Sequence, residues 1–211
     1  MLLCVLLTLS VDRRKVLSGL LEQVLSTRSL SLLKQLFRYV LHIVGICLKG
    51  CSSMTTLITP ESGTDWDHVD LFLAGGISNC PDWQNEAVQM LDGLDLFVAN
   101  PRRSYGLEKT GDVAAKQIAW EHEMLSRAAV TLFWFSAGAI QPIALLELGR
   151  KMAEDKPLVV GVDEYYERRF DVEQQLWLER EQKPLYSLIE VVSKATEECY
   201  RARGLHCPKN I

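Results

Sequence analysis

The sequence of 211 residues lacks the residue spacings from which disulfide frameworks and zinc sites are built. Its six cysteines are scattered along the chain: Cys4, Cys47, Cys51, Cys80, Cys199 and Cys207. No two of them form a CxxC pair, which favours a protein of the reducing cytoplasm over a disulfide-stabilised secreted domain. None of the four histidines completes a zinc-ligand set with the cysteines near the C-terminus. We therefore expect no metal and no cofactor.

Three further absences narrow the class of protein. The net charge of −4 gives no basic footprint for nucleic acid. No apolar run reaches the roughly 20 residues that a membrane-spanning helix needs, and the longest run near the start, Met1–Val11, is too short. The chain has no P-loop and no nucleophile elbow. With 48% hydrophobic and 24% charged residues, the composition is that of a globular protein.

The chain divides at Met54 into two unlike parts. Residues 1–53 carry seven basic and two acidic side chains, whereas residues 54–211 carry 16 basic and 25 acidic ones. Apolar residues of the first part recur at helical spacing, and basic residues interrupt every apolar run. We therefore expect residues 1–53 to be a basic, Leu-rich helical extension outside the working domain, with Met54 as a candidate functional start. The alternative is that this extension lies on a membrane surface.

From Met54 onward, short apolar segments alternate with segments of helical periodicity. The expected strands are Val69–Ala74, Asp95–Ala99, Val130–Phe135 and Pro157–Val162, followed by a short extended piece at Pro184–Tyr186. The expected helices are Asp82–Leu91, Val113–Arg127, Pro142–Ala153, Asp171–Arg180 and Leu188–Arg203. Met54–Asp67 is polar and is expected to be a lead-in loop. This alternation predicts an α/β domain with a flavodoxin-like, doubly wound parallel sheet of about five strands.

The ends of the expected strands are rich in small, polar and charged residues. They are Gly75-Gly76, Asn100–Arg103, Ser136–Gly138 and Asp163-Glu164. Ligands of such sheets bind beyond the carboxyl ends of the strands, so this set indicates a pocket rim. Gly75 and Gly76 either form a tight turn or allow a sugar or phosphate to approach the backbone. Arg102 and Arg103 either clamp a phosphate or form solvated ion pairs.

Two glutamates occupy positions where a charge is costly unless it is paired or used. Glu121 lies on the apolar stripe of its expected helix. Glu147 interrupts an apolar run near the start of the helix after the third strand, where the helix dipole favours its ionised form. Each is either half of a structural ion pair, with Arg150 or Arg127 as the partner, or a functional group. Two such acids flanking one central strand favour function, and paired carboxylates suit glycosidic chemistry.

Several short motifs follow one another in a fixed order between Val69 and Gln175. They are FLAGGI (Phe72–Ile77) with Asp82–Gln84 behind it, NPRR (Asn100–Arg103), QIAWE (Gln117–Glu121), LFWF (Leu132–Phe135), PIALLELG (Pro142–Gly149) and KPLVVGV followed by FDVEQQ. In this order they resemble the nucleoside 2-deoxyribosyltransferase-like family. Residues 1–53 have no counterpart in the resemblance.

The resemblance implies a reaction and a set of site residues. Glu147 would attack C1′ of a 2′-deoxynucleoside, release the base and form a 2-deoxyribosyl-enzyme ester, from which a second base or water takes the sugar. Glu121 would orient the substrate or move its proton. Trp120 either packs in the core or stacks on a base. The expected substrate-binding residues are Ala74, Gly75, Gly76, Asn100, Arg102, Arg103, Gln117, Trp120, Ser136 and Gln141.

The chain also departs from the family's pattern. Well-characterised transferases have an acid six residues before the nucleophile, where this chain has Gln141. Three functions are therefore open: transfer of 2-deoxyribose between bases, hydrolysis of nucleosides or nucleoside 5′-monophosphates, and a non-catalytic nucleotide-binding module. The expected partner is a small deoxynucleoside or nucleotide. A homo-oligomer is also expected, because members of the family complete their sites across subunits.

Overall fold

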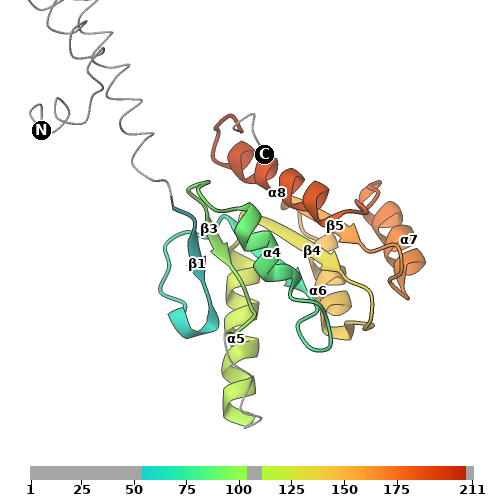
Figure 1. The fold of residues 1–211 in the computed structure, drawn as a ribbon, viewed down its shortest axis with the longest axis horizontal. Coiled ribbons are helices and arrows are strands. Elements are labelled where there is room, and N and C mark those ends of the chain that lie inside the picture. The colour runs from blue at the N-terminus through green and yellow to red at the C-terminus, as the bar shows by residue number, and fades with distance from the viewer. Residues whose placement is uncertain (1–53, 104–110, 208–211) are drawn as a thin grey trace, which may run out of the picture. The chain divides into compact units, whose positions relative to one another are not determined.

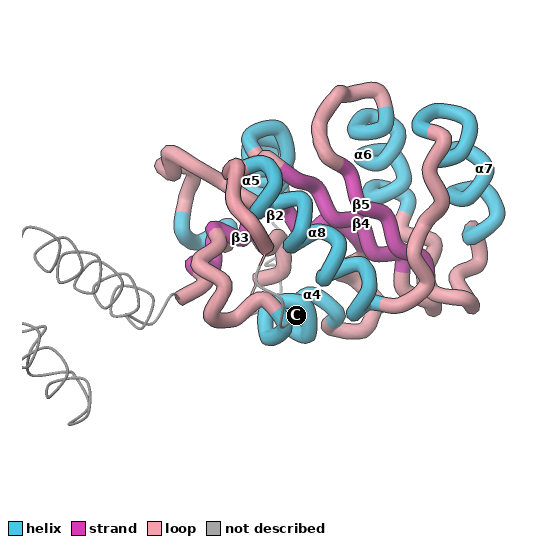
Figure 2. The backbone as a smooth tube through the Cα atoms, turned by 90° about the horizontal axis from the view of Figure 1, so that it is seen from above, coloured by secondary structure: helices cyan, strands magenta, loops and turns pink. Residues whose placement is uncertain are grey.

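The computed structural model describes residues 54–103 and 111–207, so the extension expected at residues 1–53 lies outside the described residues. The described residues belong to one compact unit. A five-stranded sheet lies at the centre of this unit, and helices cover both faces of the sheet (Figures 1 and 2).

The sheet is entirely parallel, which confirms the predicted α/β class. Its strands are β1 (Thr56–Ile58), β2 (Leu71–Gly75), β3 (Phe97–Ala99), β4 (Val130–Phe135) and β5 (Leu158–Val162). They lie in the order β1-β3-β2-β4-β5. From β2 the chain passes to β3 on one side and then crosses to β4 on the other. The topological switch point, where sheets of this kind bind ligands, is therefore between β2 and β4.

The fifth strand of the sheet is not the segment that the sequence pattern suggests. Residues 54–67, expected to be a loop, contain β1 and the short 3-10 helix η1 (Pro60–Ser62). Strand β1 pairs with β3 along one edge of the sheet, whereas Pro184–Tyr186 contributes only an isolated bridge between Leu185 and Gly161. A three-residue edge strand is too short for its alternation to be recognised, and its pairing with β3 holds it in place.

The five expected helices are all present, with ends within two residues of the predicted ones. They are α4 (Trp83–Met90), α5 (Gly111–Arg127), α6 (Pro142–Met152), α7 (Arg169–Arg180) and α8 (Leu188–Ala202). Side chains cap two of them: Asp82 accepts a hydrogen bond from the Asn85 N–H at the start of α4, and Ser187 accepts one from Glu190 N–H at the start of α8. Such caps satisfy backbone donors that have no partner within the helix.

Two apolar layers hold the helices on the sheet. Phe72, Phe133 and Phe135 belong to the layer that packs with α5, α6 and α7. Leu73 and Trp134, on the opposite face, pack with α4 and α8. Figure 2 shows α6 and α7 on one side of the strands and α4 on the other. Because both faces are covered, the strands are continuous apolar runs, and α5 and α6 lie over the same face beside the switch point.

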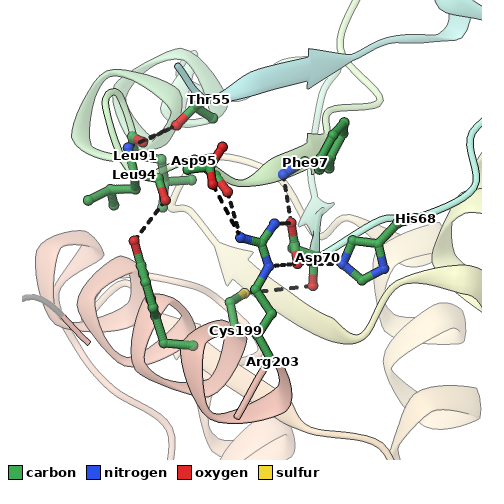
Figure 3. Close-up of polar contacts among 10 residues, drawn as sticks. Thr55, His68, Asp70, Leu91, Leu94, Asp95, Phe97, Cys199 and Arg203 are labelled. Atoms are coloured by element: carbon green, nitrogen blue, oxygen red, sulfur yellow. Dashed lines mark hydrogen bonds and ion pairs between the residues drawn. The ribbon is translucent and has the colours of Figure 1, made fainter. Parts of the chain in front are cut away.

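A buried ion pair fixes the end of α8 near the start of β2 (Figure 3). The Asp70 side chain is 1% exposed and accepts a hydrogen bond of 2.7 Å from Arg203 Nε. Phe97 N–H donates to the same carboxylate at 2.7 Å, and His68 Nε2 lies 2.6 Å from it. Burial alone would raise the pKa of Asp70, but these partners outweigh it and lower the pKa.

Candidate active site

A pocket of about 900 Å³ opens at the carboxyl ends of β2 and β4, between α5 and α6. Its wall is formed by the turn after β2, by the loop that leads into α6 and by residues of both helices. This is the switch point of the sheet, where the strand order predicts a ligand site.

Glu121 and Glu147 both line the pocket, one from α5 and one from α6. Burial raises the pKa of Glu147 to about 7; the nearby charge of Glu121 adds to this effect and Arg150 opposes it. Burial also raises the pKa of Glu121, although a hydrogen bond from Gln117 Nε2, 2.8 Å from its Oε1, favours the ionised form. Two acids that repel each other in a half-buried pocket favour a state with a single negative charge between them.

The local sequence explains why the two acids face the pocket. Gln141 adopts a left-handed conformation (φ 57°, ψ 55°), and Pro142 then begins α6 directly after the loop that follows β4. Ala144 and Leu148 of α6 are buried against the sheet, which leaves Glu147 at the border of the buried face. Glu121 has the same position on α5, one turn after the buried Gln117.

The last residue of β2, Gly75, and the next residue, Gly76, are packed too tightly for any side chain larger than that of glycine. A Cβ atom on Gly75 would lie 2.3 Å from the Trp134 carbonyl oxygen, and its φ of +150° also disfavours other residues. A Cβ atom on Gly76 would lie 2.4 Å from Cys80 Sγ. Ala74, Gly75 and Gly76 all line the pocket, so the two glycines let the backbone of this segment lie at the pocket wall.

Gln141 joins the turn after β2 to the end of β4. Its Oε1 accepts a hydrogen bond of 2.7 Å from Gly76 N–H, and its Nε2 donates to the Ser136 carbonyl oxygen at 2.8 Å. A carboxylate at this position could accept from Gly76 but could not donate to Ser136. The amide of Gln141 therefore makes both hydrogen bonds, which an ionised acid at this position could not do.

Other expected site residues lie behind the pocket wall. Asn100 Oδ1 accepts a hydrogen bond from Arg102 N–H, and the Arg102 guanidinium pairs with Asp82 at 2.9 Å. Arg103 Nε donates to Gln117 Oε1 at 2.8 Å. Neither arginine lines the pocket. Gln117 in turn donates to Glu121, and the positive charge of Arg103 behind it favours the ionised form of Glu121.

Trp120, for which both packing in the core and stacking on a base were considered, belongs to the core, and so does Trp134. Trp120 is 3% exposed, and its Nε1 donates to the Gly63 carbonyl oxygen at 2.8 Å. Trp134 belongs to the apolar layer on the opposite face of the sheet. Ser136 is also buried and contacts Gln141. None of these three side chains lines the pocket.

The structural ion pairs considered for the two glutamates do not form among the residues that the structure describes. Arg127 pairs with Glu123 at 2.7 Å instead of Glu121. Arg150 lies 2.7 Å from His122 Nδ1 and forms no ion pair with Glu147. Neither glutamate therefore forms an ion pair with a cationic side chain of the described residues.

Sequence patterns missed the aliphatic part of the pocket wall. Its members are Ile77, Ile118, Ile140, Ile143 and Leu146. Ile143 is 63% and Leu146 72% exposed, although periodicity alone makes both look like core residues of α6. A signal was available, because α6 is apolar on nearly every face and only one of those faces can be buried against the sheet. His122 and Arg150, which also line the pocket, depend on a contact between two helices and carry no local signal.

Two observations concern metals and membranes. In residues 54–103 and 111–207, no three His, Cys, Asp or Glu side chains gather in a group that could hold a metal ion. Within the same residues, no helix combines the length and the apolar character needed to cross a bilayer.

The fold and the pocket define an α/β protein with two carboxylates at the switch point of a parallel sheet. The family model described as nucleoside 2-deoxyribosyltransferase like matches residues 68–166, which include β2 to β5 and both glutamates. This part of the chain belongs to the nucleoside 2-deoxyribosyltransferase-like family. A comparison with curated proteins found no match.

Proposed function

We propose that the protein transfers 2-deoxyribose between nucleobases through a covalent ester on Glu147. One observation carries this proposal: Glu121 and Glu147 come from neighbouring helices, line one pocket at the switch point and have no ion-pair partner among the described residues. Paired carboxylates of this kind serve as nucleophile and proton carrier in glycosidic chemistry. Membership of the family supports a nucleoside-type substrate.

The proposed reaction has two chemically symmetric halves. A carboxylate oxygen of Glu147 forms a bond to C1′ as the C1′–N bond of the substrate breaks, and the bonding electrons remain on the base nitrogen. Glu121, in its protonated form, gives its proton to the departing base. A second base then attacks C1′, its proton returns to Glu121, and the ester bond to Glu147 breaks. Hydrolysis differs only in that water takes the place of the second base.

The proposed binding site assigns different parts of the wall to different parts of the substrate. The end of β2 with the residue that follows it (Ala74–Gly76) would contact the sugar, and Gln117 would hold Glu121 in position. Arg103 would support Gln117 from behind the wall, and Gln141, which itself lines the pocket, would hold Gly76 in place. The aliphatic side chains would face the apolar surfaces of the base and sugar, as is usual in pockets for small molecules.

We also propose that the protein acts as a homo-oligomer in the cytoplasm. Ile118, Ile143 and Leu146 leave large apolar side chains exposed on neighbouring helices, which supports a covered surface in the assembled protein. The three cysteines among the described residues are unpaired, which supports a reducing compartment. Light scattering coupled to size-exclusion chromatography measures the mass of the assembly, and a monomeric mass would contradict the oligomer.

Residues 54–211 are proposed to carry the activity alone. The compact unit that contains all described residues begins at Met54, which supports this division. A protein that lacks residues 1–53 should therefore fold and retain the turnover rate of the full chain. Loss of folding or of turnover on this deletion would overturn the division.

One incubation separates the three functions weighed above. The full-length protein is mixed with deoxyadenosine, with and without a second free base, and the products are separated by chromatography. Exchange of the base supports transfer, free deoxyribose supports hydrolysis, and binding without turnover supports a non-catalytic module. Glu147→Gln should lower turnover by about a thousandfold or more. Glu179→Gln, a change at an exposed glutamate of α7, is the matched control and should retain full activity.

A further inference from the structure

Arg150 is a charged group of the pocket wall that the proposed transfer does not use. It lies on α6, one helical turn after Glu147, and both side chains line the pocket. Its Nη1 lies 2.7 Å from His122 Nδ1 on α5. A guanidinium can only donate, so Nδ1 of His122 must accept and the neutral ring carries its proton on Nε2. This contact holds the guanidinium between the two helices that also carry the two glutamates.

The other nitrogens of Arg150 have no hydrogen-bond partner. Nε and Nη2 are shielded from solvent and unpaired among the described residues. Leaving donors of a charged group buried and unpaired is unfavourable, because these donors lose their hydrogen bonds to water without replacement. Two other arginines of the described residues pair with carboxylates: Arg169 with Glu173 and Arg203 with Asp70. The shielded positive charge of Arg150 therefore lacks a compensating anion.

Glu147 is the anion best placed to compensate Arg150. The charged or titratable groups that line the pocket with Glu147 are Glu121 and His122 on α5 and Arg150 on its own helix; the turn after β2 and the loop before α6 contribute none. Glu121 disfavours the ionised form of Glu147, and His122 accepts from the arginine and is neutral. Among these pocket-lining groups, the positive charge that favours ionised Glu147 is that of Arg150.

We infer that Arg150, oriented by His122, is a positioning residue that holds Glu147 in the ionised form needed for attack on C1′. The part of this inference that concerns catalysis rests on the proposed function. The interaction also changes during the proposed reaction, because Glu147 loses its negative charge when it becomes an ester. The arginine then faces a neutral group, which disfavours the ester relative to the free carboxylate and keeps the intermediate reactive.

The test compares Arg150→Met with Arg150→Lys and with a matched control, Arg168→Met. Methionine keeps the apolar stem and removes the charge, lysine restores the charge, and Arg168 is a half-exposed arginine that pairs with Asp171 away from the pocket. Carbon-13 NMR follows the titration of the Glu147 carboxyl group, whose signal is identified by its loss in Glu147→Gln. This readout needs no catalytic activity.

Arg150→Met should raise the pKa of Glu147 by about one unit or more, since an opposite charge nearby favours the ionised form by that order. Arg150→Lys should restore most of the difference, and Arg168→Met should change nothing. In the exchange assay, kcat/KM of Arg150→Met should fall about tenfold at pH 6 and approach the wild-type value at high pH. Loss at every pH would instead indicate a structural role and would overturn the inference.

An unchanged Glu147 titration in Arg150→Met overturns the inference whatever the activity. If Arg150→Met does not fold, Arg150→Gln provides the same loss of charge with a polar side chain. If the wild-type protein shows no turnover, the proposed function fails, while the NMR titration still decides whether Arg150 controls the ionisation of Glu147.

Discussion

Replacing Arg203 by methionine removes the cation that fixes the end of α8 near the start of β2 (Figure 3). Asp70 is 1% exposed, so its carboxylate cannot exchange the lost partner for bulk water. It keeps a hydrogen bond from Phe97 N–H and a contact with His68, whose side chain is 50% exposed. The perturbation therefore leaves a buried charge with two weaker partners.

Removing one partner of a buried, hydrogen-bonded ion pair costs about 3–5 kcal/mol. The two remaining partners of Asp70 place Arg203→Met at the lower end, about 3 kcal/mol in the free energy of unfolding. For a domain of this size, 1 kcal/mol corresponds to about 2–4 °C, so Tm should fall by roughly 6–12 °C. Arg201→Met is the matched control: Arg201 is 67% exposed and pairs with Glu198, and its loss should cost less than about 1 kcal/mol.

Thermal unfolding followed by circular dichroism at pH 7 measures both variants. The ion pair between Asp70 and Arg203 should also make the stability of the protein depend on pH. Because the pKa of Asp70 is lowered in the folded protein, its stabilisation is present above the ordinary pKa of an aspartate, 3.8, and is lost as the pH falls through the lower folded pKa. The difference in Tm between wild type and Arg203→Met should therefore narrow in strong acid. Equal Tm values for Arg203→Met and Arg201→Met at pH 7 would refute the reasoning.

Three further predictions concern the pocket and the core. The kcat/KM of transfer should fall as the pH increases above about 7, because Glu147 has a pKa of about 7 and the reaction needs one ionised and one protonated carboxyl group, a state that is lost when both glutamates ionise; a rate independent of pH from 5 to about 9 would contradict this. Gly161→Ala should destabilise the fold by about 1–3 kcal/mol in chemical denaturation, since its Cβ would lie 2.2 Å from Val191, whereas Gly149→Ala has open space and should not. Gln141→Glu should cost about 1–3 kcal/mol by the same measurement, because the acid cannot donate to the Ser136 carbonyl oxygen.

Most of the fold can be predicted from local pattern. Strand β4 is a run of six buried residues, and Pro142 marks the start of the helix that follows it. Each such element carries its own signal of length, periodicity and capping. Strand β1 carries none, because three residues at a sheet edge show no periodicity; its position depends on pairing with β3, about 40 residues further along the chain.

Some residues of the candidate site can likewise be predicted from the sequence, and others cannot. Glu121 and Glu147 can be identified because a charge on an apolar helix face needs an explanation. The position of Arg102 outside the pocket cannot be predicted in this way, because its ion pair with Asp82 joins two separate segments of the chain. The contact between His122 and Arg150 likewise joins residues 28 positions apart and exists only when α5 and α6 lie side by side.

Mass spectrometry of the protein during turnover tests the central claim most directly. The protein is quenched in acid after mixing with deoxyadenosine, digested and searched for a peptide that carries one 2-deoxyribosyl group. The account predicts this group on Glu147, and its absence from Glu147→Gln, since the covalent route requires an ester there. Base exchange without any adduct on Glu147, or full exchange by Glu147→Gln, would contradict it.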